Sequence, residues 1–140
     1  IFQDFNLLDT LTAYENIALA LSIQNVKAGE IDRRVKKVAN ELGIYEVLNK
    51  YPYQMSGGQK QRVASARALI TNPKLVLADE PTGNLDSVTS MEVVELLKSC
   101  AARFHQTTLI VTHQEEVAQM ADRVIRMSDG KIYTRDCNDC

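Results

Sequence analysis

The chain has 140 residues, which is enough for one domain or for part of one. Its 45% hydrophobic and 24% charged residues are typical of a globular protein, and a net charge of -2 gives no sign of nucleic-acid binding. No apolar run reaches membrane-spanning length, no secretory signal is present, and an odd number of cysteines argues against a disulfide framework and favours a reducing compartment.

The first part of the chain is predicted to be helical. A helix over 12–24 begins with Thr12–Glu15, whose first and last residues form the pattern of a capping box. A second helix over about 29–42 carries apolar residues at the three- and four-residue spacing of one buried stripe. A short helical turn at 45–49 follows. Residues 10–55 are therefore expected to form a small helical lobe without a strand.

A serine and two glycines open the next helix, which is expected to run to about Ile70. Ser56 suits the cap position, while Gly57 and Gly58 permit a close backbone approach to a ligand. The free amides and the dipole at such a helix start attract an anion such as phosphate. A plain helix start in a loop explains the same residues, so this pattern alone is weak.

The stretch Leu75–Glu80 combines a continuous apolar run with two adjacent acids. The apolar part predicts a strand buried on both faces of a parallel sheet. Asp79 and Glu80 follow at its carboxyl end, which is where α/β sheets bind ligands. Because neighbouring residues of an extended chain point to opposite sides, one acid can hold a metal while the other faces a water. An ordinary strand end with two solvated acids is the alternative.

A second buried strand over 108–112 ends at His113. It follows a helix over 87–102 that Asp86 is well placed to cap. The handedness of parallel crossovers puts both strand ends on the same edge of one sheet, so His113 is expected near the two acids. The remaining expected elements are a helix over 115–121 and a hairpin with strands over 123–127 and 131–134.

The two ends of the chain carry weaker signals. Cys137 and Cys140 form a single C-x-x-C pair, and because a structural zinc site needs four ligands, zinc or redox chemistry there is disfavoured. The chain opens on Ile1 rather than methionine, so Ile1 is not expected to be a translation start. Ile1 and Phe2 read as the last residues of a strand, with Gln3 just outside it.

Taken together, five segments resemble the ATP-binding-cassette (ABC) ATPases. In chain order, Gln3, Met55–Gln59, Leu75–Glu80, Asn84–Asp86 and His113 match the Q-loop, signature, Walker B, D-loop and H-loop of that family. The combination is specific and spans nearly the whole chain, although Met55 replaces the usual leucine of the signature. With Phe2–Leu8 and Leu11–Ile17, the stretch Ala78–Asp86 is most similar to the branch that serves lipoprotein release, macrolide or peptide export and the cell-division exporter-like complex.

The resemblance implies an α/β fold like that of P-loop NTPases. It would comprise a helical signature lobe at about 10–55 and part of a parallel-sheet, RecA-like core at about 56–140. No G-x-x-x-x-G-K-[S/T] motif occurs in the sequence. The family's Walker A loop would precede Ile1, so we expect the larger, C-terminal part of a nucleotide-binding domain that begins at the Q-loop.

The resemblance also implies roles for residues around the two strand ends, with ATP and Mg²⁺ as cofactors. Gln3 would contact Mg²⁺ and the attacking water, and would link to a transmembrane partner. Asp79 would hold Mg²⁺ through water. Glu80 would act as general base or polarise the water, and His113 would contact the γ-phosphate.

The signature and the D-loop would act between two subunits. Ser56, Gly57, Gly58 and Gln59 would clamp the γ-phosphate of ATP held by a second nucleotide-binding subunit. Asn84 and Asp86 would bridge the two sites of the resulting head-to-tail dimer. The helical lobe would dock a transmembrane permease, which implies a cytoplasmic protein on the inner face of the cell membrane.

Three classes of function therefore compete. The first is an ATPase subunit of an export-type transporter, represented by part of its nucleotide-binding domain. The second is a soluble relative in chromosome maintenance or translation, which would carry long coiled-coil heptads or tandem cassettes that this sequence lacks. The third is a non-catalytic interaction fragment, which describes the 140 residues in isolation better.

Overall fold

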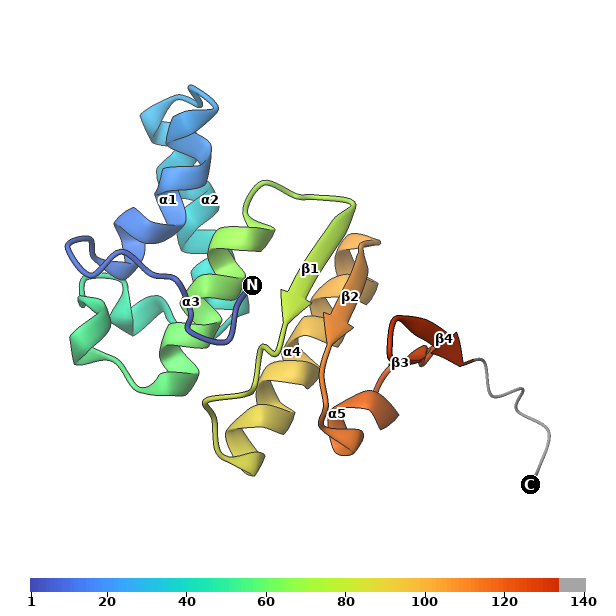
Figure 1. Ribbon diagram of the computed structural model, residues 1–140. Coiled ribbons are helices and arrows are strands. Elements are labelled where there is room, and N and C mark those ends of the chain that lie inside the picture. The colour runs from blue at the N-terminus through green and yellow to red at the C-terminus, as the bar shows by residue number, and fades with distance from the viewer. Residues whose placement is uncertain (134–140) are drawn as a thin grey trace.

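The computed structural model describes residues 1–133, whose path is shown in Figure 1. Helices alternate with strands only in the second half. The elements in chain order are α1 (Ala13–Ile23), α2 (Ala28–Glu41), the 3-10 turns η1 (Tyr45–Val47) and η2 (Pro52–Gln54), α3 (Gly57–Leu69), β1 (Leu75–Asp79), α4 (Ser87–Phe104), β2 (Thr107–Val111), α5 (Glu115–Gln119), β3 (Arg126–Ser128) and β4 (Lys131–Tyr133).

The helical lobe forms largely from local signals. The Thr12 hydroxyl accepts from the Glu15 amide at 3.3 Å and the Glu15 carboxylate accepts from the Thr12 amide at 2.8 Å, which confirms the capping box. Gly43 follows α2 with φ +64°, a conformation that favours glycine. The apolar stripes of α1 and α2 pack on α3. The largest fully buried apolar side chains of the lobe are Ile17, Leu21, Val35, Leu42, Ile44 and Val47.

The sheet that carries the strand ends has β1 in its middle. β1 pairs with β2 in parallel, with Leu75 opposite Thr107 and Asp79 opposite Val111. Phe2 forms a parallel bridge to Asp79, which puts the start of the chain on the other side of β1. Helix α4 connects β1 to β2 and runs along one face of the pair (Figure 1). The two carboxyl ends therefore lie on one edge, as predicted.

The prediction that β1 is buried on both faces is wrong. Val76 and Ala78 are buried, whereas Leu75 is 51% exposed and Leu77 57% exposed. In β2, Leu109 and Val111 are similarly exposed on the same face. The physical reason is that, within residues 1–133, elements pack against only one face of this pair. We call the open apolar surface of Leu75, Leu77, Leu109 and Val111 the bare sheet face.

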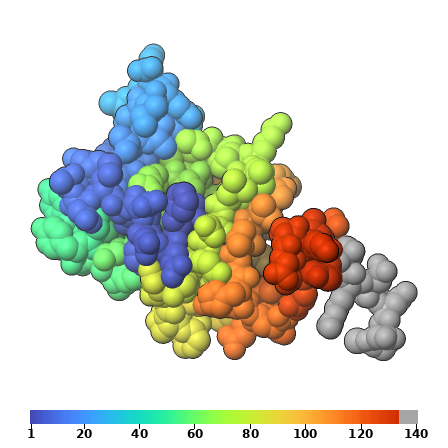
Figure 2. Space-filling model, viewed as in Figure 1, coloured from blue at the N-terminus to red at the C-terminus, as the bar shows by residue number. Residues whose placement is uncertain are grey.

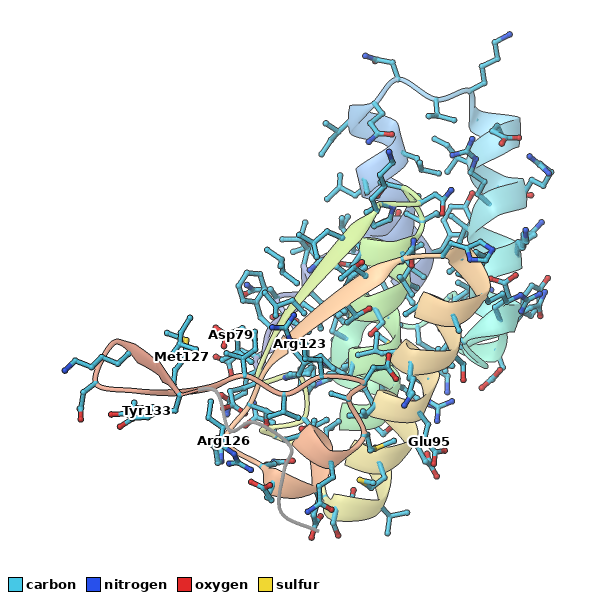
Figure 3. The ribbon with its side chains drawn as sticks, turned by 90° about the vertical axis from the view of Figure 1, so that its right-hand side faces the viewer. Asp79, Glu95, Arg123, Arg126, Met127 and Tyr133 are labelled. Atoms are coloured by element: carbon cyan, nitrogen blue, oxygen red, sulfur yellow. The ribbon has the colours of Figure 1, made fainter. Side chains whose placement is uncertain are left out.

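The C-terminal hairpin is shorter than predicted. β3 and β4 pair with each other, and residues 123–125 stay outside the strand. Figure 3 shows that this hairpin, which carries Met127 and Tyr133, projects from the rest of the molecule. Cys100 is a buried free thiol, whereas Cys137 and Cys140 lie outside the described residues. None of the helices within residues 1–133 is both long and apolar enough to cross a membrane.

Candidate functional site

Glu80 stands at the carboxyl end of β1 in an unusual backbone conformation. Its φ is +44°, in the left-handed region that residues other than glycine rarely adopt. Its amide donates to the Val111 carbonyl at 2.8 Å, so the chain stays tied to β2 while it turns. Such strain persists only where surrounding contacts over-determine it, and it is common at functional sites.

The Glu80 side chain is held by the end of the next strand. One carboxylate oxygen accepts from the His113 amide at 2.9 Å and lies 2.7 Å from His113 Nδ1. The other accepts from the Thr112 hydroxyl at 3.3 Å. The Glu80 side chain is 21% exposed and that of His113 is 78% exposed, so solvent reaches the pair from the histidine side. The expected proximity of His113 to Glu80 is thus confirmed.

Asp79 ends β1 and is exposed, beside the start of the chain. Its amide donates to the Ile1 carbonyl at 2.9 Å, which brings Gln3 to the same edge of the sheet. No group of three or more acidic, histidine or cysteine side chains among residues 1–133 is arranged to hold a metal ion. A single exposed carboxylate such as that of Asp79 is nevertheless compatible with Mg²⁺, which commonly takes one or two carboxylates and completes its shell with water and substrate phosphates.

The Gln3 side chain rests on the loop after Glu80. Its Nε2 donates to Asn84 Oδ1 at 3.3 Å, and Asn84 Nδ2 donates to the Gln3 carbonyl at 3.2 Å. A Cβ on Gly83 would lie 2.6 Å from Gln3 Cδ, so glycine is needed for this contact. Figure 2 shows the start of the chain in the seam between the helical lobe and the strands. Gln3 is therefore near the strand edge, with its amide turned to Asn84.

Ser56 and Gln59 cap the helix α3 through a reciprocal pair of hydrogen bonds. The Ser56 hydroxyl accepts from the Gln59 amide at 3.2 Å, and the Gln59 side-chain oxygen accepts from the Ser56 amide at 3.0 Å. The capping role predicted for Ser56 is confirmed. Ser56 is exposed, so its hydroxyl and the start of the helix face solvent.

Packing within this chain leaves little room for a side chain at the two glycines of α3. A Cβ on Gly57 would lie 3.1 Å from Leu85, and one on Gly58 would lie 2.6 Å from Thr89. Asp86 caps α4 next to them, because its carboxylate accepts from the Thr89 amide at 3.0 Å. The hydrogen bonds from the Thr89 amide and hydroxyl lower the pKa of Asp86 below its usual value. The start of α3 is thus fixed against the loop that follows Glu80.

The predicted site residues form two groups. Gln3, Asp79, Glu80, Asn84 and His113 gather around the strand ends, and Ser56–Gln59 lie with Asp86 at the starts of α3 and α4. Within the part of the chain that the structure describes, no hydrogen bond or ion pair joins the side chains of Ser56–Gln59 to Asp79, Glu80 or His113. The catalytic, nucleotide-binding and metal-binding roles of these residues stay predictions.

Sequence reasoning missed several polar residues around Glu80. Thr112 donates to its carboxylate, and Gln61 of α3 donates to the Pro81 carbonyl at 2.5 Å. Thr82 is fully buried and donates to the Gln114 side chain at 3.1 Å. Gln61 lies in the polar run Gln59–Arg62, and nothing in that run indicates that its side chain is buried or which residue it bonds to.

The chain is similar to known proteins over nearly its whole length. The family model described as "ABC transporter" matches residues 1–83. The bacitracin export ATP-binding protein BceA of Halalkalibacterium halodurans is 48% identical over 96% of this chain and 53% of its own length. The methionine import ATP-binding protein MetN 1 of Yersinia pestis is 44% identical over 97% of this chain and 40% of its own.

A solved structure shares the fold. The ATP-binding cassette MJ0796, in a dimeric post-hydrolysis state bound to ADP and Pi, superposes with a TM-score of 0.81 at 38% identity, over 95% of this chain and 60% of that one. The chain spans about half the length of the curated relatives it matches. The fold, the order of the motifs and these similarities agree, and the chain belongs to the ABC transporter family.

Proposed function

We propose that the chain is part of an ATP-binding and ATP-hydrolysing subunit that powers the transmembrane permease of an export-type ABC transporter. The observation that carries this proposal is the Glu80–His113 pair at the carboxyl ends of two adjacent parallel strands. A carboxylate and an imidazole there suit the orientation of a water and contact with a phosphate. The family membership supplies the class of substrate.

The residues of this chain would divide the work as follows. Glu80 would orient and polarise the attacking water while the His113 amide and ring hold its carboxylate in place. Asp79, exposed at the strand end, would hold Mg²⁺ through water, and Gln3 would join it after leaving Asn84. Mg²⁺, when bound, neutralises charge on the phosphate oxygens.

We further propose that two such subunits form a head-to-tail dimer. Ser56, Gly57, Gly58 and Gln59 would then close on ATP held by the partner subunit, with Asn84 and Asp86 at the junction. The dimeric state of the related cassette MJ0796 supports this arrangement. The start of α3 supplies a helix N-terminus, whose amides and dipole attract an anion.

Export is favoured over import by the motif Ala78–Asp86 and by the similarity to BceA. The protein would work on the cytoplasmic face of the membrane, with residues 10–55 as the permease-docking lobe and 56–140 as part of the core. The similarity to MetN 1 makes an import subunit the second candidate. Because the 140 residues contain no Walker A motif, we infer that by themselves they neither bind ATP in the family's mode nor hydrolyse it.

The test is the Glu80→Gln substitution in the full-length protein. Removing the carboxylate while keeping its shape should lower kcat at least about 100-fold, because general-base catalysis contributes that much or more. ATP binding should persist, so the variant should accumulate as an ATP-bound dimer in size-exclusion chromatography. The matched control is Glu95→Gln, an exposed glutamate on α4 far from Asp79 (Figure 3), which should hydrolyse ATP normally.

Two results would contradict the proposal. Normal turnover by Glu80→Gln would show that Glu80 does not act on the water. An inactive variant that stays monomeric with ATP would remove the support for a dimer closed by ATP.

A further inference from the structure

The buried polar residues of this chain are concentrated around one loop. Five polar residues are buried among those described, and three of them, Gln61, Thr82 and Ser90, belong to or hydrogen-bond to residues 81–82, which follow β1, while Ser65 donates to the Gln61 carbonyl. Gln61 and Ser65 come from α3, Ser90 from α4, and Thr82 from the loop itself. Buried polar side chains cost free energy unless they are hydrogen-bonded, so such a cluster needs a physical reason.

Gln61 ties helix α3 to the loop. Its side chain is fully buried, and its Nε2 donates to the Pro81 carbonyl at 2.5 Å. Its Oε1 is also buried and finds no donor within residues 1–133. An apolar residue would avoid this unsatisfied oxygen, so the side chain is better explained by the bond to Pro81 than by packing.

Thr82 ties the same loop to the segment after β2. It is fully buried, and its hydroxyl donates to Gln114 Oε1 at 3.1 Å. The Gln114 amide donates to the Thr112 hydroxyl at 3.1 Å, and that hydroxyl donates to the Glu80 carboxylate. Together with the backbone from Glu80 to Thr82, these hydrogen bonds close a ring through Gln114 and Thr112 back to Glu80.

This ring includes Glu80, the residue with the strained backbone. Glu80 keeps φ +44° with its carboxylate against His113, and its neighbour Pro81 is held from α3. A strained backbone persists only when several contacts fix it. We propose that Gln61 and Thr82 are positioning residues that hold 80–82 so that Glu80 stays on His113, and that they connect the helix begun by Ser56 to this pair.

The proposal rests on the proposed ATPase function and is tested in the full-length protein with its permease. Thr82→Val keeps the shape of the side chain and removes the hydroxyl, whereas Thr82→Ser keeps the hydroxyl. Gln61→Met keeps the length of the side chain and removes the donor to Pro81. We expect Thr82→Val and Gln61→Met to lower kcat about tenfold or more, because small displacements of a reacting group have effects of that size.

The KM for ATP should stay within about twofold of the wild-type value, because neither residue would touch the nucleotide. Thr82→Ser should restore most of kcat. The control is Asn16→Ala, which removes the buried polar side chain of α1, whose hydrogen bonds go to the backbone of residues 8–12. It should lower the unfolding midpoint while kcat below that midpoint stays unchanged, which separates loss of stability from loss of position.

The outcomes are distinct. If wild-type protein does not hydrolyse ATP, the proposed function fails and this inference fails with it. If wild-type and Thr82→Ser are active and Thr82→Val matches them, only the positioning role is overturned. Equal loss of kcat in Thr82→Ser and Thr82→Val would also overturn it, because shape alone would then matter. Should Gln61→Met fail to fold, the Thr82 pair decides.

Discussion

The helical lobe and the β1–β2 pair differ in how completely they bury their apolar residues. In the lobe, Ile17 and Leu21 are fully buried, because α1, α2 and α3 supply each other's neighbours. In the strand pair, Leu77 and Leu109 remain more than half exposed on the bare sheet face. A lobe built from adjacent helices completes its packing within a short stretch of chain, whereas a parallel sheet depends on partners that lie elsewhere.

The same substitution in the two regions tests this difference and should give the largest effect. Leu21→Ala removes a fully buried side chain and should lower the free energy of unfolding by about 3 kcal/mol, through lost burial and a cavity. Leu77→Ala removes a side chain that is 57% exposed and should cost less than about 1 kcal/mol. Urea unfolding of the 140-residue chain, followed by circular dichroism, measures both.

Making the same two substitutions in the full-length protein sharpens the comparison. In the full-length protein, Leu77→Ala should become as costly as Leu21→Ala if further segments cover the bare sheet face. Equal effects of both substitutions in the 140-residue chain itself would mean that this face is already covered there, for example by self-association of the exposed apolar surface.

Two glycines in helices should respond to the same substitution with opposite signs. At Gly58 a new Cβ would lie 2.6 Å from Thr89, whose β-branched side chain is fixed by its hydrogen bond to Asp86. Gly58→Ala should therefore destabilise the chain by about 1–3 kcal/mol. At Gly29 in α2, nothing lies within 4 Å, so Gly29→Ala should stabilise it by about 0.5–1 kcal/mol. Thermal unfolding of both variants measures the difference. If Gly58→Ala is as stable as the wild type, α3 and α4 can move apart at little cost.

Sequence reasoning succeeded where the cause is local. The cap at Thr12 and the cap at Ser56 depend on residues within one turn, and both are confirmed. The proximity of Glu80 and His113 was also predictable, because a parallel crossover brings two strand ends to one edge.

Sequence reasoning failed where the cause lies in distant neighbours. The apolar run Leu75–Ala78 is the pattern of a strand covered on both faces, but exposure depends on which segments are present to cover it. The bond from Gln61 to Pro81 joins residues 20 positions apart, and no periodicity indicates it. The hydrogen bond from the Gln3 side-chain amide to Asn84 joins residues 81 positions apart, and no sequence pattern indicates it either.

The smallest effect concerns the outer surface of the lobe, where Glu30 forms ion pairs with Arg33 at 2.8 Å and Arg34 at 2.7 Å. Their hydrogen bonds lower the pKa of Glu30 from 4.5 to about 2. A carboxylate with a depressed pKa stabilises the folded state above its unfolded pKa and loses that contribution as the pH falls through the folded value. The stability of the wild-type chain should therefore fall between about pH 4.5 and 2 by more than that of Glu30→Gln.

The measurement is the urea midpoint at each pH, with Glu46→Gln, an exposed residue of η1, as the control for general acid effects. Because these pairs are exposed, 1 M salt should shrink the difference between wild type and Glu30→Gln. Parallel pH profiles for the two proteins at low salt would mean that the arginines do not hold Glu30 in solution, and the lobe would then owe its stability to its buried core alone.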